Sequence, residues 1–301
     1  MDDKTEQSVY WLNLAYKSLQ QREPDGKLYI AYSGGKDSEC IADLCMTHLP
    51  KDAFEINYNA TGIDPPEVVK HIKARFRAWE ANGIECHFNK PSANMHDLIV
   101  KKGPPTRLKR YCCEYFKESA SDGRVTITGV RWAESSRRKD GHDVVTVYAS
   151  KRENRARYHT DNDVETQIME QCRMRGRLTV NPIIHWTDDD VWQYIRECEI
   201  IYCTLYDEGF KRLGCIGCPL AGTKTMKQEF LRWPHMERYY RRAIAAFLAR
   251  NPEKYALKHG WRTVDDVWHW WIQDGIAPGQ VTMDEYLDSR PERAERIGME
   301  G

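Results

Sequence analysis

The stretch Ser33-Gly34-Gly35-Lys36-Asp37-Ser38 decides the fold, because it joins an apolar run typical of a strand to a segment typical of a helix. The apolar run covers residues 28–32, and the helical segment covers residues 39–48. Glycines let backbone N–H groups approach an anion, a helix start adds partial positive charge, and serine hydroxyls donate further hydrogen bonds. A strand, a glycine turn and a helix in this order predict a binding site for a polyphosphate.

The spacing of this loop narrows the class of nucleotide site. It fits neither G-x-x-x-x-G-K-[ST] nor G-x-G-x-x-G, which excludes the common P-loop and dinucleotide fingerprints. The loop resembles the S-G-G-x-D-S loop of the ATP pyrophosphatases, enzymes that split ATP between its α and β phosphates. The alternative is an ordinary glycine-rich turn, which would not need Lys-Asp-Ser after the glycines.

Length and charge limit the class of protein. The chain has 301 residues, enough for one large α/β domain with an appended piece or for two small domains. Its 45 lysines and arginines balance its 45 aspartates and glutamates, so the totals do not suggest a polybasic nucleic-acid binder. No apolar run approaches membrane-spanning length, and the N-terminus is too polar for a signal peptide. We therefore expect a cytoplasmic protein without a membrane partner.

Apolar runs alternate with helical patterns along the chain. Further strands are predicted at residues 54–59, 84–88, 125–130 and 178–184, with a helix that opens at Pro65-Pro66. This alternation predicts an α/β fold with a doubly wound, mostly parallel sheet, whose ligands bind beyond the carboxyl ends of the strands. The later residues are helical and aromatic, and we expect the rings to pack as a core rather than to stack on bases. The domains are therefore predicted as a nucleotide-binding domain at residues 1–222 and a helical C-terminal region at residues 223–301.

Five of the ten cysteines are gathered in motifs. Cys215-Ile216-Gly217-Cys218-Pro219 is a C-x-x-C turn, and Cys112-Cys113 is a vicinal pair far upstream. The cytosol disfavours disulfides, whereas both motifs can present thiolates to one metal centre. Four thiolates suit a [4Fe–4S] cluster or zinc, and Cys203 is a fifth candidate ligand. The residues alone assign neither the metal nor a unique set of four ligands.

An ordered series of motifs over residues 25–222 resembles the phosphoadenosine phosphosulfate reductase family. Beside the phosphate loop, the matching segments are DPPE at 64–67, RYCCEYFK at 110–117, GVRWAES at 129–135, NPIIHWTDDDVW at 181–192, and LYDEGF at 205–210 through Cys218-Pro219. The resemblance implies the α/β sandwich of the adenine nucleotide alpha-hydrolase-like proteins.

Two branches of this family imply two sets of cluster ligands. Cys112, Cys113, Cys215 and Cys218 look like the four [4Fe–4S] ligands of the bacterial adenylylsulfate reductases. The chain also resembles the ATPase component of bacterial DNA phosphorothioation, which combines an S-G-G-K-D-S loop with a cluster but uses one upstream and three downstream cysteines. That second pattern implies Cys112, Cys203, Cys215 and Cys218.

Two departures from the reductases favour ATP chemistry. The reductases usually lack an intact S-G-G-x-D-S loop, because their substrate carries a sulfate where ATP carries its β-phosphate, whereas here the loop is intact. They also use a nucleophilic cysteine in a C-terminal tail, and no cysteine follows Cys218 in this sequence. We therefore expect an AMP-forming ATP pyrophosphatase that adenylates an acceptor oxygen, after which a sulfur nucleophile displaces AMP. In this interpretation the protein is an ATP-dependent sulfurtransferase.

Each residue of the phosphate loop has an expected role. The backbone amides of Gly34, Gly35 and Lys36 and the hydroxyls of Ser33 and Ser38 hold the phosphates. The Lys36 ammonium offsets charge that develops during transfer, and Asp37 binds Mg²⁺ or anchors the loop.

Two further loops at strand ends are expected to reach the same nucleotide. Thr61, Gly62 and Asp64 line the adenosine pocket or, alternatively, form a turn with a helix-capping aspartate. Beyond Gly129, Arg131 is predicted as a second phosphate clamp. The orienting residues of this clamp are expected to be Glu134 and Ser135.

Alternatives stay open for the reaction and the partners. The first is reduction of adenylylsulfate or its 3′-phosphorylated form to sulfite, which the Cys112-Cys113 pair favours, and the second is a non-catalytic nucleotide-binding regulator with a structural metal.

The expected cofactors are ATP, Mg²⁺ and a [4Fe–4S] cluster, with zinc as the alternative to the cluster. The expected partners are an adenine nucleotide and a sulfur donor protein such as a cysteine desulfurase. A homo-oligomer is a further alternative. Basic runs at residues 131–139 and 151–157 suggest a nucleic-acid acceptor, with solvated surface charge as the alternative.

Overall fold

The computed structural model describes residues 3–91, 93–118, 123–134, 144–148, 157–158 and 177–272. The chain divides into two compact units: the first consists of Met1–Ser92 and Cys113–Cys215, and the second of Ala93–Cys112 and Ile216–Gly301. Residues 93–112 thus group with the C-terminal helices. The domain boundary at residue 222 stays a prediction from the sequence.

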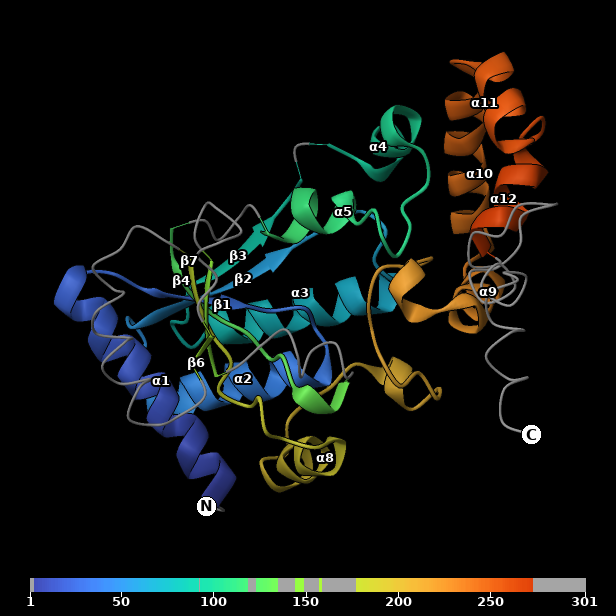
Figure 1. Ribbon diagram of the computed structural model, residues 1–301. Helices are drawn as coiled ribbons and strands as arrows, with labels where there is room; N and C mark the ends of the chain where they lie inside the picture. The colour runs from blue at the N-terminus through green and yellow to red at the C-terminus, as the bar shows by residue number, and fades with distance from the viewer. Residues whose placement is uncertain are drawn as a thin grey trace, which may run out of the picture. The chain divides into compact units, whose positions relative to one another are not determined.

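A mostly parallel sheet forms the centre of the first unit (Figure 1). The strand order is β3-β2-β1-β4-β7-β5-β6. The five parallel strands are β1 (Leu28–Ala31), β2 (Phe54–Asn59), β3 (Cys86–Asn89), β4 (Val125–Ile127) and β7 (Arg177–Val180). The strands β5 (Val145–Tyr148) and β6 (Arg157–Tyr158), which the sequence did not predict, add to the β7 edge in antiparallel fashion. The predicted fold class is confirmed.

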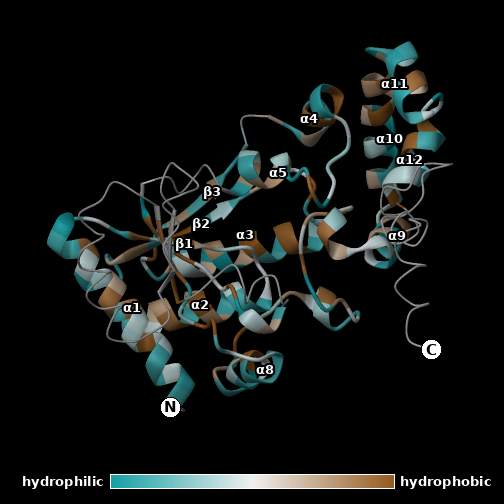
Figure 2. Ribbon diagram, in the orientation of Figure 1, coloured by the Kyte–Doolittle hydropathy of each residue, from teal (hydrophilic) through white to brown (hydrophobic). Residues whose placement is uncertain are grey.

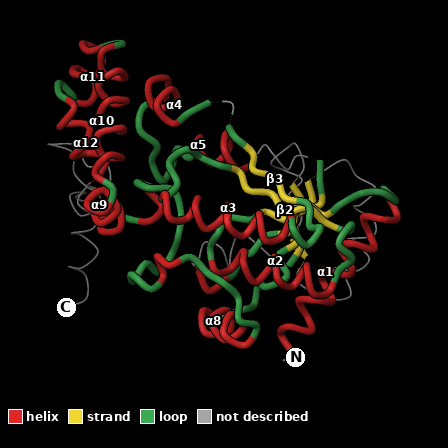
Figure 3. Tube along the Cα trace, turned by 180° about the vertical axis from the view of Figure 1, so that it is seen from behind, coloured by secondary structure: helices red, strands yellow, loops and turns green. Residues whose placement is uncertain are grey.

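Helices pack on the sheet of the first unit. They are α1 (Asp3–Arg22), α2 (Lys36–His48) and α3 (Pro66–Glu80), and α8 (Asp188–Glu197) packs on α2. Figures 1 and 3 show α2 and α3 side by side along the strands β1 to β3. The facing side chains are apolar and inaccessible to water, as for Ile30 in β1, Ile41 in α2 and Ile72 in α3, which are 0% exposed. Burial of such side chains is the main favourable contribution to folding.

The order of the strands fixes where a ligand can bind. From β1 the chain moves outward to β2 and β3 and then returns to β4 on the opposite side of β1. Connections that leave β1 and β4 in opposite directions open a crevice at the carboxyl ends of these two strands, which is where doubly wound sheets bind ligands. The phosphate loop at residues 33–38 follows β1, and the segment with Arg131 follows β4. The fold therefore places two of the three predicted loops at this switch point.

The second unit is helical. Its elements are α4 (Met95–Lys102), the 3₁₀ turn η6 (Pro219–Ala221), α9 (Thr223–Arg232), α10 (Pro234–Ala249), α11 (Pro252–His259) and α12 (Val264–Ile272), while the short α5 (Tyr111–Cys113) straddles the unit boundary. Hydrophobic and hydrophilic bands alternate along α10 in Figure 2. The aromatic residues pack as a core, as predicted, with Phe230, Trp233, Tyr240, Phe247, Trp261, Trp268 and Trp271 all buried. In the part of the chain that the structure describes, no helix is long and apolar enough to cross a membrane.

Candidate nucleotide-binding site and cysteine motifs

The phosphate loop connects β1 to α2 and is locked by its own polar groups. The Ser38 hydroxyl donates to the carbonyl of Gly35 at 2.8 Å and accepts from the backbone N–H of Ser33 at 3.2 Å. Gly34 has φ +72°, and a Cβ at this position would lie 2.8 Å from Ile72 Cγ1 in α3, so only glycine fits. The N-cap of α2 is Gly35, which has no side chain to bond the N–H groups of the first turn. The cap residue itself thus leaves the N–H groups of the helix start to other partners, as an anion site requires.

A tyrosine from a distant segment lies on this loop. The backbone N–H of Lys36 donates to the phenol oxygen of Tyr206 at 2.9 Å, and a Cβ on Gly35 would lie 3.4 Å from the same oxygen. Tyr206 belongs to the 3₁₀ turn η5 (Thr204–Tyr206), and burial raises the pKa of its phenol, which therefore keeps its proton. The phenol oxygen occupies the position that a phosphate oxygen would take on the Lys36 N–H.

We expect Tyr206→Phe to lower the Kd of pyrophosphate, because the free protein then has no hydrogen bond to give up at the Lys36 N–H. A net hydrogen bond of about 1 kcal/mol corresponds to about a fivefold change in Kd. Isothermal titration calorimetry with pyrophosphate measures this change in Kd. The control is Tyr202→Phe, since the Tyr202 hydroxyl donates to Asp207 and not to the loop. Weaker binding by Tyr206→Phe would instead mean that the phenol itself contacts the ligand.

Arg131 closes a network of charged groups beside the loop. Its side chain is 1% exposed, with Nε donating to Asp37 Oδ1 at 2.5 Å, Nη2 to Asp188 Oδ1 at 2.8 Å, and Nη1 to the carbonyl of Trp186 at 3.2 Å. Lys36 Nζ lies 3.3 Å from Asp37 Oδ2 and from Asp188 Oδ1. Two cations therefore face two carboxylates, and Arg131 holds Asp37 in place. Its role as a phosphate clamp stays a prediction.

The arrangement bears on the two roles expected for Asp37. Each carboxylate oxygen of Asp37 already faces a cationic group, one on Arg131 and the other on Lys36. A carboxylate whose charge is balanced in this way is a poor ligand for a further cation. Asp37 therefore fits the role of loop anchor better than that of a magnesium ligand.

Sequence analysis missed Asp188 as a member of this network. It placed Asp188 to Asp190 in the first turn of a helix with Thr187 as N-cap, and the structure confirms that cap: Thr187 and Asp190 form a capping box. Asp190 alone serves the cap, which leaves Asp188 for the network. Partial burial opposes its ionisation, but the hydrogen bond from Arg131 and the charge of Lys36 outweigh this and lower the pKa of Asp188. The sequence did contain a signal for this role, because residues 188–190 are three consecutive aspartates and the cap needs only one of them.

Gly129 and Glu134 support the same segment. A Cβ on Gly129 would lie 3.0 Å from the backbone carbonyl of Asp37, so the absence of a side chain lets the end of β4 approach the start of α2. Glu134 Oε2 accepts a hydrogen bond from the backbone N–H of Arg131 at 3.2 Å. Ser135 lies outside the described residues, as does most of the basic segments at residues 131–139 and 151–157.

The turn after β2 is self-contained. Asp64 Oδ2 accepts hydrogen bonds from the backbone N–H of Thr61 at 2.9 Å and from its hydroxyl at 2.8 Å, while Gly62 takes φ +75°. Asp64 therefore closes the turn on Thr61 but does not cap α3, whose N-cap is Pro65 without a side-chain hydrogen bond. A role of this turn in an adenosine pocket stays a prediction. The Cys215 thiol lies 3.5 Å from Thr61 Oγ1 and 3.9 Å from Asp64 Oδ1. One of the predicted metal ligands therefore lies at the carboxyl end of the strand next to β1.

The C-x-x-C turn is held by the core of the second unit. The backbone N–H of Gly217 donates to Glu229 Oε2 at 2.7 Å, and the Tyr240 hydroxyl donates to the carbonyl of Ile216 at 2.9 Å. Gly217 has φ +73°, and a Cβ there would lie 2.5 Å from Phe230 Cζ, so a larger residue would displace the turn. This rigidity is what a metal-binding turn requires.

The candidate ligands differ in their exposure. Cys112, Cys113, Cys215 and Cys218 are half-buried and not in disulfides, whereas Cys203 is 1% exposed. Within the second unit, Arg107 Nε donates to the carbonyl of Pro219 at 3.1 Å, which brings the segment before Cys112 against the residue after Cys218. Accessible thiols that are not in disulfides fit an iron–sulfur cluster or zinc.

A buried carboxylate was also missed. Glu39 in the first turn of α2 is 0% exposed and accepts from the Tyr32 hydroxyl, from His71 Nε2 at 2.6 Å and from Arg75 Nε at 3.2 Å. These bonds tie α2 to α3, where His71 and Arg75 lie next to Ile72, the residue that contacts Gly34. Glu39 thus supports the loop from behind.

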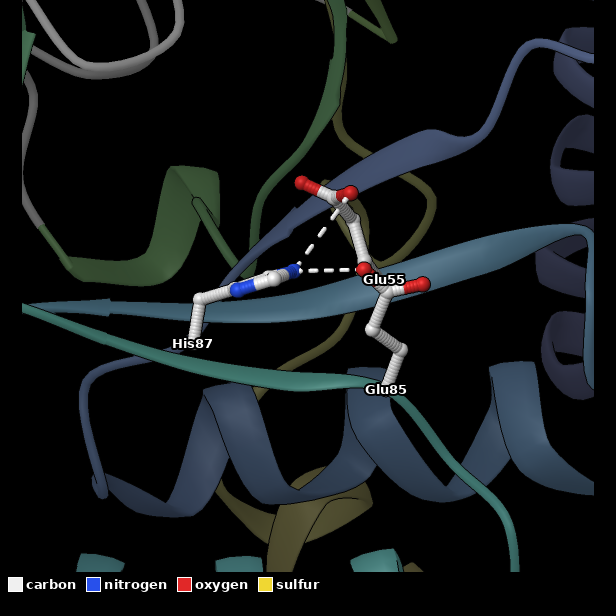
Figure 4. Close-up of side chains that lie close together, drawn as sticks. All are labelled: Glu55, Glu85 and His87. Atoms are coloured by element: carbon white, nitrogen blue, oxygen red, sulfur yellow. Dashed lines mark hydrogen bonds and ion pairs between the residues drawn. The ribbon is translucent and has the colours of Figure 1, made fainter.

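A second cluster of polar side chains lies at the amino-terminal ends of β2 and β3. Glu55, Glu85 and His87 converge there, with His87 Nε2 at 2.8 Å from Glu85 Oε1 and 3.7 Å from Glu55 Oε2 (Figure 4). Both glutamates also form ion pairs, Glu55 with Arg124 and Glu85 with Lys27. The charges are balanced within the protein, so we assign no metal to this group.

Residues 27–221 match the model of the phosphoadenosine phosphosulfate reductase domain. The chain belongs to this family. The chain is 39% identical over 240 residues to the adenosine 5′-phosphosulfate reductase of Oceanobacillus iheyensis, a match that covers 77% of this chain and 85% of the relative. It is 24% identical over 283 residues to an uncharacterized protein of Methanocaldococcus jannaschii, covering 90% of this chain but 50% of that protein. A second such protein of that organism is 29% identical over 212 residues, 67% of this chain and 43% of its own length. The chain thus spans about half the length of these two relatives.

Solved structures of related architecture are more distant. The phosphoadenylyl-sulfate reductase of Candida auris matches with a TM-score of 0.44 and 19% identity, covering 67% of this chain and 87% of that one. A U34-tRNA thiolase from Methanococcus maripaludis with a [4Fe–4S] cluster matches with a TM-score of 0.41 and 13% identity, covering 83% and 80%.

Proposed function

We propose that the chain is an ATP pyrophosphatase that adenylates an acceptor and prepares it for sulfur transfer. The observation that carries this proposal is the intact S-G-G-K-D-S loop at the β1/β4 switch point, where the N-cap of α2 is a glycine without a capping side chain. Helix starts of this kind bind phosphate groups. Lys36, whose ammonium lies 3.3 Å from Asp37 and from Asp188, is the cation of the loop that would meet a triphosphate.

The residues support cleavage between the α and β phosphates as follows. An acceptor oxygen attacks the α-phosphorus, the bond from that phosphorus to the bridging oxygen breaks, pyrophosphate leaves, and the acceptor proton passes to solvent. Loop N–H groups and the Lys36 ammonium stabilise the charge that develops on the departing pyrophosphate. Arg131 acts through Asp37, since its guanidinium is bonded to protein groups. A sulfur nucleophile then forms a carbon–sulfur bond as AMP leaves.

The cysteines would serve the second half of the reaction. Cys112, Cys113, Cys215 and Cys218 would hold a [4Fe–4S] cluster; four thiolates would occupy its four irons, so the cluster would serve to position the acceptor. The contact of Cys215 with Thr61 supports a location near the nucleotide. A sulfur donor protein, such as a cysteine desulfurase, and a cytoplasmic location remain part of the proposal.

The test measures products with the full chain, purified without oxygen. We expect [α-³²P]ATP to yield AMP and pyrophosphate, and Lys36→Ala to lower this rate by about a hundredfold, as loss of a transition-state charge contact does. Lys51→Ala is the control, because Lys51 is an exposed residue that bonds the carbonyl of Asn82. AMP formation that does not change with Lys36→Ala would contradict the proposal.

A second candidate is reduction of adenylylsulfate. It is favoured by the Cys112-Cys113 pair and by the reductase of Oceanobacillus iheyensis among the relatives. Incubation with adenylylsulfate, or its 3′-phosphorylated form, and a thiol would then release sulfite, while ATP would remain intact. A non-catalytic regulator, the remaining alternative, would bind ATP and produce neither AMP nor sulfite.

A further inference from the structure

The charges of this neutral chain are unevenly distributed. The described residues of the second unit, 93–112 and 216–272, contain fifteen lysines and arginines but only six aspartates and glutamates. The rest of the chain contains thirty and thirty-nine. Of the fifteen basic side chains, fourteen are exposed and only Arg241 is half-buried. The total charge of zero therefore conceals a large positive excess in the helical unit and an acidic excess in the rest of the chain.

Part of this charge is concentrated where a loop meets the start of α9. Arg107 reaches the carbonyl of Pro219 in η6, and its Nη2 would lie 3.5 Å from a Cβ on Gly222, the N-cap of α9. This contact brings the loop that carries Lys109 and Arg110 against the beginning of α9. The basic surface defined here consists of Arg107, Lys109, Arg110, Lys224 and Lys227.

The stability of α9 does not explain its lysines. Lys224 lies in the first turn, which contains no acidic residue, and a helix dipole disfavours cations there. Lys224 and Lys227 are three residues apart on the solvent face, while Met226 and Phe230 face the core. Like charges that are gathered on one exposed surface repel one another, and a polyanion relieves that repulsion.

We propose that this basic surface binds the sugar–phosphate backbone of a nucleic acid, which is the acceptor of the proposed sulfur transfer. The identification as acceptor rests on the proposed function, whereas the binding itself does not. The cations are exposed and spread over a loop and a helix turn, which suits regularly spaced phosphates better than one small anion that would need converging, buried donors. For binding that depends on such contacts, the logarithm of the affinity falls linearly with the logarithm of the salt concentration.

The experiment uses the full chain without ATP and measures fluorescence anisotropy of labelled duplex DNA and of labelled tRNA at several KCl concentrations. We expect Lys109→Gln/Arg110→Gln/Lys224→Gln/Lys227→Gln to weaken binding by at least about tenfold near 0.1 M salt and to reduce the salt slope by about 3, because each lost phosphate contact removes about 0.7 to 0.9. The nucleic acid bound more tightly by the wild type identifies the acceptor class.

The control removes the same charge from the far end of the unit. Arg250→Gln/Lys254→Gln/Lys258→Gln/Arg262→Gln lies around α11, and α10 separates α11 from α9 by about 24 Å along its axis. We expect this variant to bind within about twofold of the wild type, with circular dichroism melting to show that both variants fold.

Three results would overturn the inference: equal losses in both variants, no salt-dependent binding of either nucleic acid by the wild type, or binding of anionic phosphatidylglycerol vesicles in preference to both. Failure of the proposed function would show in a different measurement, the formation of AMP. A chain that binds nucleic acid through this surface but forms no AMP from ATP would retain the inferred surface and lose the proposed reaction.

Discussion

Arg131→Met is expected to lower the rate of AMP formation by at least about a hundredfold, since a misplaced catalytic group commonly costs that much. It should also lower the free energy of unfolding by about 3 kcal/mol, the size expected when one partner of a buried charge network is removed. The guanidinium is 1% exposed and bonds Asp37, Asp188 and a backbone carbonyl. Without it, two carboxylates share Lys36 alone, and Asp37 loses the contact that holds the loop. Urea unfolding and product assays measure the two effects.

Arg124→Met is the matched control for this prediction. Arg124 lies directly before β4, whereas Arg131 lies after it. Arg124 also bonds a carboxylate, that of Glu55, but its side chain is 35% exposed and lies at the amino-terminal end of the strand. Exposed ion pairs contribute about 0 to 1 kcal/mol, so we expect a small loss of stability and unchanged activity. Arg131→Lys keeps the charge without the planar fork and should fall between wild type and Arg131→Met. Equal stability losses for Arg124→Met and Arg131→Met would refute the assigned network.

Local sequence patterns were sufficient to predict most of the parallel sheet. The apolar runs that became β1, β2, β3, β4 and β7 are bounded by turn residues, and the helices between them follow a helical period. The partner of a helix is not a local property, however. Nothing in residues 95–102 distinguishes a helix that packs on the sheet from one that packs on α10, and the structure pairs α4 with α10. Fold class was therefore predictable, and the grouping of α4 with the C-terminal helices was not.

The candidate site shows the same limit. The positive φ of Gly34 and the hydrogen bond of Ser38 to its own loop are consequences of local geometry, so residues 33–38 could be identified from spacing alone. Tyr206 reaches Lys36 across 170 positions, and Asp188 reaches Arg131 across 57. Such contacts depend on which loops the topology brings to the switch point. Sequence analysis could name the strand ends that converge there, but it could not say that Arg131 would bind carboxylates of the protein.

Cys218→Ser is expected to lose nearly all bound iron and acid-labile sulfide, which in the wild type, purified without oxygen, should approach about four of each per chain. Serine cannot replace a thiolate ligand, and Cys218 lies in a turn whose backbone is fixed through Gly217 and Ile216, so no neighbouring residue can move into its place. Cys45→Ser is the control, because Cys45 is a fully buried thiol in α2, away from both motifs. Absorbance near 400 nm, together with iron and sulfide analysis, gives the result, and a colourless zinc protein would contradict the cluster.

Cys113→Ala and Cys203→Ala distinguish the two possible ligand sets. We expect Cys113→Ala to lose the cluster and Cys203→Ala to retain it, because Cys113 is half-buried and accessible to a ligand whereas Cys203 is 1% exposed. Cys203 is the N-cap of η5, and its carbonyl accepts from the N–H of Tyr206, so its side chain is positioned to pack. The reverse result would assign the cluster to Cys112, Cys203, Cys215 and Cys218. Since η5 also carries Tyr206, that assignment would connect the cluster to the tyrosine on the phosphate loop, and loss of the cluster should then change pyrophosphate affinity as well.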